Sequence, residues 1–283
     1  MTKPSVDVQE FINRHPFSRF QWITFALCFC IVLLDGFDTA AIGYIAPSLI
    51  QEWGVSKPAL APVLSAALFG LAAGALMAGP LADRLGRKKV LTGSVLVLGL
   101  FTLLSGFAAD LQSLTVMRFI TGIGLGAAMP NAVTLMSEYC PTARRSLLTN
   151  AMFCGFPLGA ALGGFLASWM IPQWGWRSVL VFGGVSPLLL LLVLLLLLPE
   201  SVRYMVAKGY DHTRIQAVLS RFSASAANAS SFFLSETRAV AAGKSGLAVV
   251  LSPSYRVGSV MLWLAYFMGL VIFYALVNWM PIL

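Results

Sequence analysis

The amino-acid sequence predicts an all-α, polytopic membrane protein. Of its 283 residues, 58% are hydrophobic and only 11% are charged, and the mean hydropathy is +0.83. This balance is far from that of a soluble domain. Seven segments are long and apolar enough to cross about 30 Å of hydrocarbon as helices. The strands of a membrane barrel would instead alternate strictly between polar and apolar side chains over about 10 residues, and such alternation is not seen.

The predicted spans follow one another with short connections. We expect a cytoplasmic N-terminus over residues 1–21 and a six-span N-terminal bundle over 22–198. The six spans are predicted at 22–50, 59–82, 90–109, 111–136, 146–171 and 178–198. A polar stretch, 199–256, is rich in Ser and Ala in its middle and is predicted to be a partly helical cytoplasmic linker. A seventh span follows over 257–283.

Lys and Arg residues predict which loops face the cytoplasm. All but three of the 19 lie before the first span, between spans two and three or four and five, or in the linker. The exceptions are Lys57 and Arg177 on the opposite side and Arg118 within a span. Cytoplasmic loops are enriched in positive charge, so we expect a cytoplasmic N-terminus. The net charge of +8 fits contact with anionic lipid headgroups. Its scatter over short loops does not favour nucleic-acid binding.

No enzymatic, metal or cofactor motif stands out. The cysteines lie in or beside spans without metal-type spacing, and the two histidines are isolated: Cys28, Cys30, Cys140, Cys154, His15 and His212. Ordinary apolar packing explains cysteines in such places. Because no nucleophile–base pair or phosphate-binding loop is apparent either, we expect neither enzymatic activity nor a cofactor or metal.

The first span carries two aspartates within the apolar run LLDGFDTAAIGYIAP. Asp35 and Asp38 are three residues apart, so they project from one side of a helix. A central aspartate costs about 2.5 to 3.5 kcal/mol in a span, which makes two of them costly without a purpose. Two carboxylates this close repel each other when both are ionised, which favours holding a proton. We predict a proton-coupling site that faces a water-filled cavity; the alternative is hydrogen bonding to neighbouring helices.

Arg118 is the basic residue predicted to lie inside a span, in LTVMRFITGIGLGAAMP. Counted along the helices, Arg118 and Asp35 both lie roughly 20 Å from the cytoplasmic side. A buried guanidinium needs a partner, and the options are the first-span aspartates or an anionic substrate. Arg118 is therefore either one half of a structural ion pair or a substrate-binding residue that exchanges an aspartate for a carboxylate. Gly122, Gly126 and Pro130 continue a small-residue stripe that predicts close helix packing.

The loop GPLADRLGRKK, between spans two and three, is the third candidate site. Gly79 permits close approach of a neighbour, Asp83 accepts from cations or caps a helix, and Gly86 allows a tight turn. Arg87, Lys88 and Lys89 keep the loop inside, and Arg84 is a further basic residue of the same loop. On charge alone this is a solvated turn. Together with the charged residues at the ends of spans four and five, it is a candidate ion-pair latch between access states; those residues are Glu138, Arg144 and Arg145.

Several of these motifs resemble those of a known family. GPLADRLGRKK resembles the loop signature of the major facilitator superfamily, Arg118 with its glycine stripe resembles the fourth-helix motif, and PESVR resembles the motif after the sixth helix. DGFDTAAIGYIAP resembles the first-helix signature of the aromatic acid:proton symporters. The likeness continues through SEYCPTARRSLLTNAMFCGFPLG and WLAYFMGLVIFYALVNWMP.

The resemblance implies a major facilitator fold that normally has twelve spans. The chain would then be an N-terminal six-helix bundle, a cytoplasmic linker and a seventh span, with the C-terminal bundle largely missing. It also implies that Asp35 and Asp38 are needed for transport, and that the residues of the loop signature govern the conformational switch. Arg118 and Glu138 match charged positions of the family. The implied activity is proton-coupled import of an aromatic carboxylate, such as 4-hydroxybenzoate or protocatechuate, across the bacterial inner membrane.

Two alternatives stay open at this point. The chain could belong to a sugar or other organic-acid porter, because the loop and PES-x-R motifs are shared across the superfamily; a neutral sugar has less need for the DGFD pair. It could also be a truncated membrane protein that does not transport, unless a separate C-terminal half completes the cavity.

Overall fold

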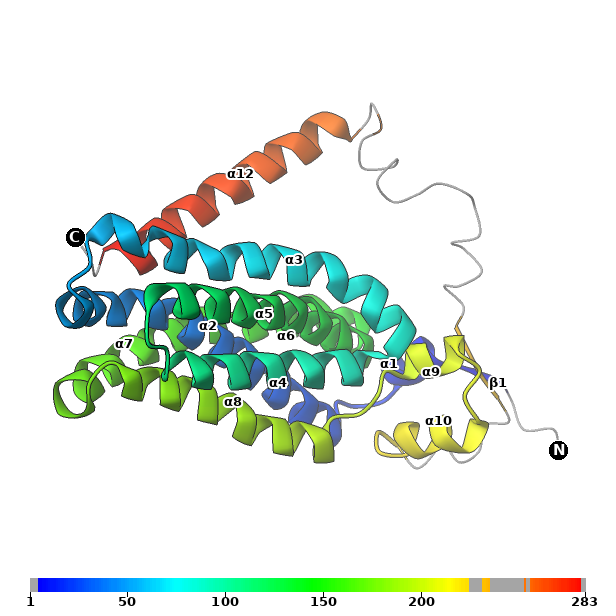
Figure 1. Ribbon diagram of the computed structural model, residues 1–283. Helices are drawn as coiled ribbons and strands as arrows, with labels where there is room; N and C mark the ends of the chain where they lie inside the picture. Colours follow the sequence, from blue (N-terminus) through cyan, green and yellow to red (C-terminus); the bar gives the residue numbers. More distant parts are fainter. Residues whose placement is uncertain (1–4, 224–230, 235–251, 253–254, 281–283) are drawn as a thin grey trace.

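The computed structural model describes residues 5–223, 231–234, 252 and 255–280 of the chain. Long helices run side by side as a bundle, and one further helix, α12 (Arg256–Tyr274), leans against it near its own C-terminal end (Figure 1). Seven helical stretches in this part of the chain are long and apolar enough to cross a membrane. The number of predicted spans is therefore confirmed.

The helices begin and end within a few residues of the predicted spans. Spans one to four and span six are, in order, α2 (Arg19–Trp53), α3 (Ala61–Leu85), α4 (Arg87–Ser105), α5 (Leu111–Tyr139) and α8 (Arg177–Leu197). A 3₁₀ turn, η1 (Lys57–Leu60), leads into α3. A π-helical turn, η5 (Ala275–Trp279), continues α12.

The fifth span, expected over 146–171, consists of two consecutive helices. These are α6 (Arg145–Phe153) and α7 (Gly155–Trp174), with a break at Cys154. Pro157 has no backbone N–H, so it cannot donate to the carbonyl of Phe153 four residues earlier. The break falls where this hydrogen bond is missing.

Side-chain caps fix where the spans that carry the candidate residues begin. The Ser18 hydroxyl accepts from the backbone of Gln21, whose side chain accepts from the backbone of Ser18, which is a capping box at the start of α2. Asp110 caps α5 in the same way, with Ser113 as its partner. The backbone N–H of Ser113 lowers the pKa of the Asp110 carboxyl. These caps fix the first residues of α2 and α5, from which the depth of the buried aspartates and of Arg118 along each helix follows.

The predicted small-residue stripe of span four lets α3 and α5 approach closely. A Cβ at Gly122 would lie 2.1 Å from the carbonyl oxygen of Ala67, and one at Gly126 would lie 2.0 Å from that of Leu71. No side chain fits at these distances. The prediction that the stripe serves packing is confirmed, and this contact holds α5 in place against α3.

The described parts of the N-terminal segment and of the linker, 5–18, 199–223 and 231–234, fold together at one end of the bundle (Figure 1). The strands β1 (Ser5–Asp7) and β2 (Ser231–Phe233) pair in parallel. The helices α1 (Val8–Arg14), α9 (Val202–Ala207) and α10 (His212–Leu219) complete a unit that we call the cap. Its buried apolar side chains share one core with the adjoining ends of the spans, and include Val8, Phe11, Ile12, Val202, Met205, Ile215 and Leu219. The helices of the linker were predicted; their union with the N-terminal segment was not.

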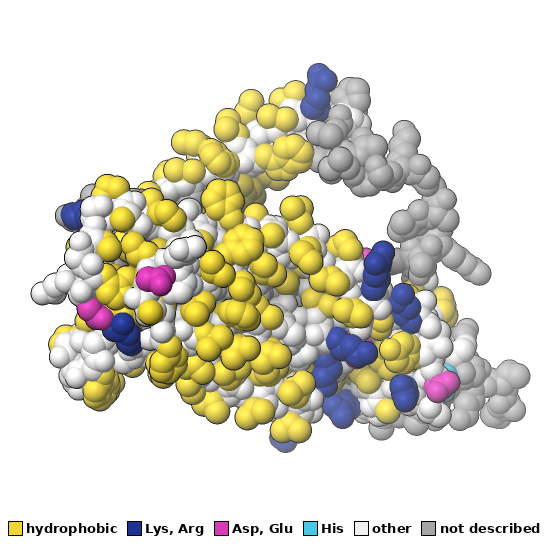
Figure 2. Space-filling model, viewed as in Figure 1, with side chains coloured by type: hydrophobic (Ala, Val, Ile, Leu, Met, Phe, Trp, Pro, Cys, Tyr) yellow, Lys and Arg dark blue, Asp and Glu magenta, His cyan; other side chains and the backbone are white. Residues whose placement is uncertain are grey.

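The opposite end of the bundle is tied by one polar cluster. Trp176 donates its indole N–H to Glu52 at 2.6 Å, and Arg177 pairs with the same carboxylate while lying over the Trp176 ring. The cluster joins the end of α2 to the start of α8. Figure 2 shows that most Lys and Arg side chains on the visible face gather at the cap end, whereas hydrophobic side chains cover the sides of the bundle.

Candidate functional site

Arg118 forms a two-pronged ion pair with Asp38. Its Nη1 lies 3.0 Å from Asp38 Oδ1 and its Nη2 lies 2.8 Å from Oδ2, while Nη2 also donates to the Asp38 backbone carbonyl at 3.1 Å. Thr102 of α4 donates its hydroxyl to Asp38 Oδ1 at 2.7 Å. Both charged side chains are completely buried. The pair therefore joins α2, α4 and α5 at one point and leaves no net charge there.

The partner of Arg118 is Asp38, although Asp35 was expected at a similar depth. Residues three apart on a helix differ by about 60° in direction, so the two aspartates face different neighbours. Asp38 points toward α4 and α5, where Thr102 and Arg118 meet it. Asp35 points elsewhere, and the single acidic patch expected from the sequence is divided into two environments.

Asp35 lines a cavity of about 970 Å³ between the bundle and α12. It is buried, and its Oδ1 accepts a hydrogen bond from Thr39, one turn further along the same helix, at 3.4 Å. Among the residues that line this cavity, Asp35 is the one with a charged side chain. The cavity thus presents one carboxyl group within apolar and aromatic walls.

The walls of the cavity come from six helices, α2, α3, α5, α6, α7 and α12. The residues other than Asp35 are Leu68, Leu71, Ala75, Leu125, Gly126, Met129, Pro130, Val133, Thr134, Phe153, Phe156, Pro157, Leu270, Phe273 and Tyr274. Phe156 of α7 lies against Phe273 of α12, with ring centroids 5.6 Å apart. The hydroxyl of Thr134 donates to the Pro130 carbonyl of its own helix. This lining suits a planar ring better than a polar sugar.

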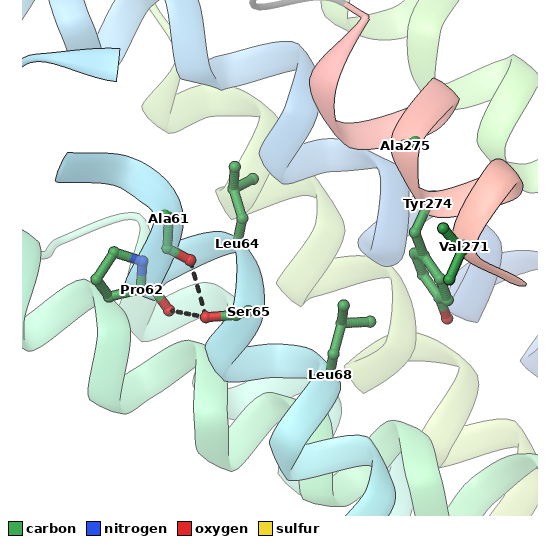
Figure 3. Close-up of a pocket in the computed structure, with 8 residues that line it drawn as sticks. All are labelled: Ala61, Pro62, Leu64, Ser65, Leu68, Val271, Tyr274 and Ala275. Carbon is green, nitrogen blue, oxygen red and sulfur yellow. Dashed lines mark hydrogen bonds between the residues drawn. The ribbon is translucent and has the colours of Figure 1, made fainter. Parts of the chain in front are cut away.

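A second cavity, of about 670 Å³, lies between the start of α3 and the end of α12 (Figure 3). Ser65 and Tyr274 carry its hydroxyl groups, and that of Ser65 donates to the carbonyls of Ala61 and Pro62 at 2.8 and 3.3 Å. Leu68 and Tyr274 line both cavities, so the two are neighbours. The side chains that line this second cavity include no ionisable carboxyl or basic group, and the larger cavity is the better candidate.

Aromatic side chains of the first spans have mixed placements. Phe153 and Phe156 line the larger cavity, whereas Phe37 packs against Phe182. The hydroxyl of Tyr44 donates to a carbonyl of α7, and Phe69 is exposed on the side of the bundle. Sequence spacing alone did not separate these cases.

The structure brings together some of the predicted switch residues. Arg87 and Asp83 form an ion pair at 2.9 Å across the α3–α4 turn, where Gly86 has a φ of +101°. The Glu138 carboxylate at the end of α5 interacts electrostatically with Arg87 and Arg203.

The other predicted switch residues lie apart from these charges. Arg84 accepts a hydrogen bond from the hydroxyl of Tyr204 through its backbone carbonyl. Arg144 is exposed at the end of a short turn, η2 (Thr142–Arg144). Gly79 is exposed, with no neighbour where its Cβ would lie.

Glu200 also contributes to this region, although the charge pattern of the sequence did not point to it. Its Oε1 accepts from the backbone N–H of Lys88 at 3.1 Å, so it caps the start of α4. The φ of +101° at Gly86 is one that residues with a Cβ rarely adopt, which explains why this turn carries glycine; a Cβ there would also meet the Glu200 carboxylate. In the sequence, Glu200 belongs to the PESVR motif after span six, which resembles a family motif but does not by itself indicate a helix cap.

Comparison with known proteins identifies a family and a substrate class among relatives. Residues 28–283 match the Major Facilitator Superfamily. The chain is 55% identical to a 4-hydroxybenzoate transporter of Pseudomonas putida, over 99% of this chain and 62% of that protein. It is 48% identical to a gallate transporter of the same organism, over all of this chain and 64% of that protein. The chain therefore spans less than two thirds of the length of these relatives.

Among solved structures, the inward-open xylose transporter of Escherichia coli shares the fold. The TM-score is 0.64 at 20% sequence identity, over 92% of this chain and 63% of that one. At this identity the likeness concerns the arrangement of helices alone.

Proposed function

The chain belongs to the Major Facilitator Superfamily, and from this premise we propose that it acts in the import of an aromatic carboxylate together with protons. The protein crosses the membrane several times. We place it in the bacterial inner membrane with its N-terminus in the cytoplasm, because the Lys and Arg side chains gather at the cap end. The observation that carries the proposal is the aromatic cavity whose one charged lining residue is Asp35.

Asp35 is the proton-binding residue of this proposal. It faces the cavity and accepts one long hydrogen bond, from Thr39. Among the described residues, no Lys or Arg lines the cavity beside it, so the ionised form has no cationic partner from this part of the chain. A carboxyl group in this position gains by taking up a proton when the cavity excludes water.

Asp38 and Arg118 supply the second part of the mechanism. While the pair is closed, both charges are satisfied. Protonation of Asp38 would free the planar fork of Arg118 for the carboxylate of the substrate, which offers the same two-oxygen geometry. A proton that moves with a monoanion carries no net charge against the membrane potential, which opposes an inward-moving anion by about 2.3 kcal/mol per 100 mV.

The cavity walls and the relatives support an aromatic substrate. Phe153, Phe156 and Phe273 supply ring faces and edges for offset or edge-to-face contact. The relatives named above carry 4-hydroxybenzoate and gallate, both of which combine a ring with a carboxylate. We propose a substrate of that class.

The conformational switch is proposed to lie at the cap end of the bundle. There, the Asp83–Arg87 pair, Glu138 and the capped start of α4 connect spans two, three and four. Rocking of the bundle would make and break such contacts at its rim. Gly86 and Arg84 belong to the same α3–α4 turn and are assigned to this switch. Gly79 and Arg144 are assigned to it from the sequence alone.

Uptake measurements test the proposal. In a strain that lacks other aromatic-acid carriers and expresses the gene, Asp35→Asn should abolish accumulation of labelled 4-hydroxybenzoate, and a protonophore should do the same. Asp110→Asn is the matched control, because it makes the same change in an exposed cap that asparagine also supports. Excess benzoate should compete and excess xylose should not. Accumulation that survives both Asp35→Asn and the protonophore would contradict the proposal. Normal abundance of the unmodified protein in the membrane without any uptake would contradict it as well.

A further inference from the structure

The N-terminal helix α1, which is part of the cap, contacts its surroundings with two different faces. Val8, Phe11 and Ile12 are buried in the core that the cap shares with the spans. Gln9 and Asn13, which are four residues apart and therefore on one face, turn toward the connection between spans four and five. A helix of this kind is held by packing on one side and by hydrogen bonds on the other.

The side-chain amide of Gln9 contacts three segments at once. Its Nε2 donates to the backbone carbonyl of Cys140 at 3.3 Å, just beyond the end of α5. Its Oε1 accepts from Arg145 at 3.1 Å and from Arg203 at 2.9 Å. Asn13 adds a fourth contact, because its Oδ1 accepts from the backbone N–H of Thr142 at 2.8 Å.

These contacts lie where the helix ends leave backbone groups without helical partners. The last carbonyls of a helix have no intrahelical donor, and α5 ends at Tyr139. Gln21 donates to the Tyr139 carbonyl at 2.7 Å, and Gln9 serves that of Cys140. Arg145 opens α6 of span five, and Arg203 lies in α9, after span six. One amide therefore connects the ends of spans four, five and six.

The helix is anchored on its N-terminal side as well. The strand β1 precedes it directly and pairs with β2, so that Val6 lies opposite Phe232. The ring of Phe232 in turn stacks on His212 of α10, with centroids 5.0 Å apart. The N-terminal segment is thereby attached to the linker and to the bundle together.

We propose that Ser5–Arg14 is a built-in clamp and that Gln9 is its positioning residue, holding the cap-side ends of spans four, five and six together as one body. The proposal does not depend on what the protein transports. Two guanidinium groups meet a neutral oxygen in this clamp, and such bonds are weaker than those to a carboxylate. The clamp is therefore built to be releasable.

Cys140 provides a reporter for opening of the clamp. Its side chain is buried, and its own backbone carbonyl is the one that Gln9 binds. Burial raises the pKa of its thiol to about 12, so the reactive thiolate is scarce while the clamp is closed. Opening would expose the thiol to water and speed its alkylation.

The first experiment measures maleimide labelling of Cys140 as the one remaining thiol of the full chain, after replacement of the other cysteines by Ala: Cys28, Cys30 and Cys154. Gln9→Ala should accelerate labelling about tenfold, because a lost hydrogen bond to a charged group shifts an opening equilibrium by at least that factor. Glu10→Ala is the matched control on the same helix, since the side chain of Glu10 makes an exposed pair with Arg14, and it should leave the rate unchanged.

A second protein, which retains Cys28 in place of Cys140, separates opening of the clamp from general loosening. Cys28 is buried in α2 within the bundle, and Gln9→Ala should not change its labelling rate. Equal acceleration at both thiols, or no acceleration at Cys140, would overturn the proposal. If Gln9→Ala does not accumulate, Asn13→Ala decides, because it removes the bond to the backbone N–H of Thr142. Faster labelling of Cys140 than in the parent, with Cys28 unchanged, supports the clamp, and an unchanged rate at Cys140 contradicts it.

Discussion

The two aspartates of α2 show how one turn of helix separates two chemical roles. Asp38 has four hydrogen bonds from Arg118 and Thr102, counting the one to its backbone carbonyl. Asp35 has one, from Thr39. The same side chain therefore serves as a structural counter-ion in one position and as a lone carboxyl in a cavity in the other. This difference gives the two residues distinct expectations for stability.

Asp38→Asn should destabilise the protein strongly, because it leaves the buried charge of Arg118 without a counter-ion, a loss that costs about 3 to 5 kcal/mol. Asp35→Asn should have little effect on stability, because it replaces an unpaired carboxyl by a neutral group of the same shape. Thermal unfolding of the purified protein in detergent measures both. The double variant Asp38→Leu, Arg118→Met should recover much of the stability lost in Asp38→Asn. Equal losses in the two single variants would contradict the different roles.

The sequence predicted the aspartates and the arginine as important but could not predict which of them pair. Depth along a helix follows from a residue count, since the rise per residue is constant. Direction around the helix has meaning only once the neighbours are known, and Thr102 and Arg118 lie 64 and 80 residues from Asp38 along the chain. The contacts that decide which aspartate pairs with Arg118 are therefore long-range, and a single sequence does not reveal them.

At the scale of helices, the spans were the most predictable feature and the cap was the least. A fixed hydrocarbon thickness demands runs of about 20 apolar residues, and those runs are visible without any neighbour. The break at Cys154 had a local signal in Pro157 that hydropathy alone ignores. The cap rests on polar contacts such as that between Gln9 and Arg203, which are 194 residues apart. No periodicity in the sequence marks such a contact.

Close packing of α3 and α5 gives an expectation at this scale. Gly126→Ala should lower the unfolding temperature, because a Cβ there would lie 2.0 Å from a backbone carbonyl of α3 that cannot move without shifting the helix. Gly93→Ala is the matched control, since nothing lies within 4 Å of the corresponding Cβ position on α4. That change should be neutral or slightly stabilising, because alanine favours a helix more than glycine does. Equal melting temperatures for the two variants would contradict close packing as the function of the stripe.

At the scale of the whole molecule, the distribution of charge and the position of α12 define two ends and one open side. On the face that Figure 2 shows, most Lys and Arg side chains gather at the cap end, while Glu52, Trp176 and Arg177 connect two helices at the other end. None of the described side chains of α12 is buried, although its C-terminal end closes the cavity that contains Asp35. The cavity therefore lies at the side where the bundle meets the seventh span, as expected for a transporter built from two bundles around a central site.

The orientation of the molecule in the membrane can be tested with one residue from each end. Lys57 lies in the turn before α3, and Lys208 follows α9 in the cap; both are exposed. Because positive charge is retained in the cytoplasm, Lys57→Cys should react with a membrane-impermeant maleimide on intact cells, and Lys208→Cys should react only after permeabilisation. Replacing Cys30 and Cys154, the exposed native cysteines, by Ala removes background labelling. The opposite pattern would place the cap outside the cell, and the direction of transport, the access of protons to Asp35 and the side on which the Gln9 clamp acts would all have to be reversed.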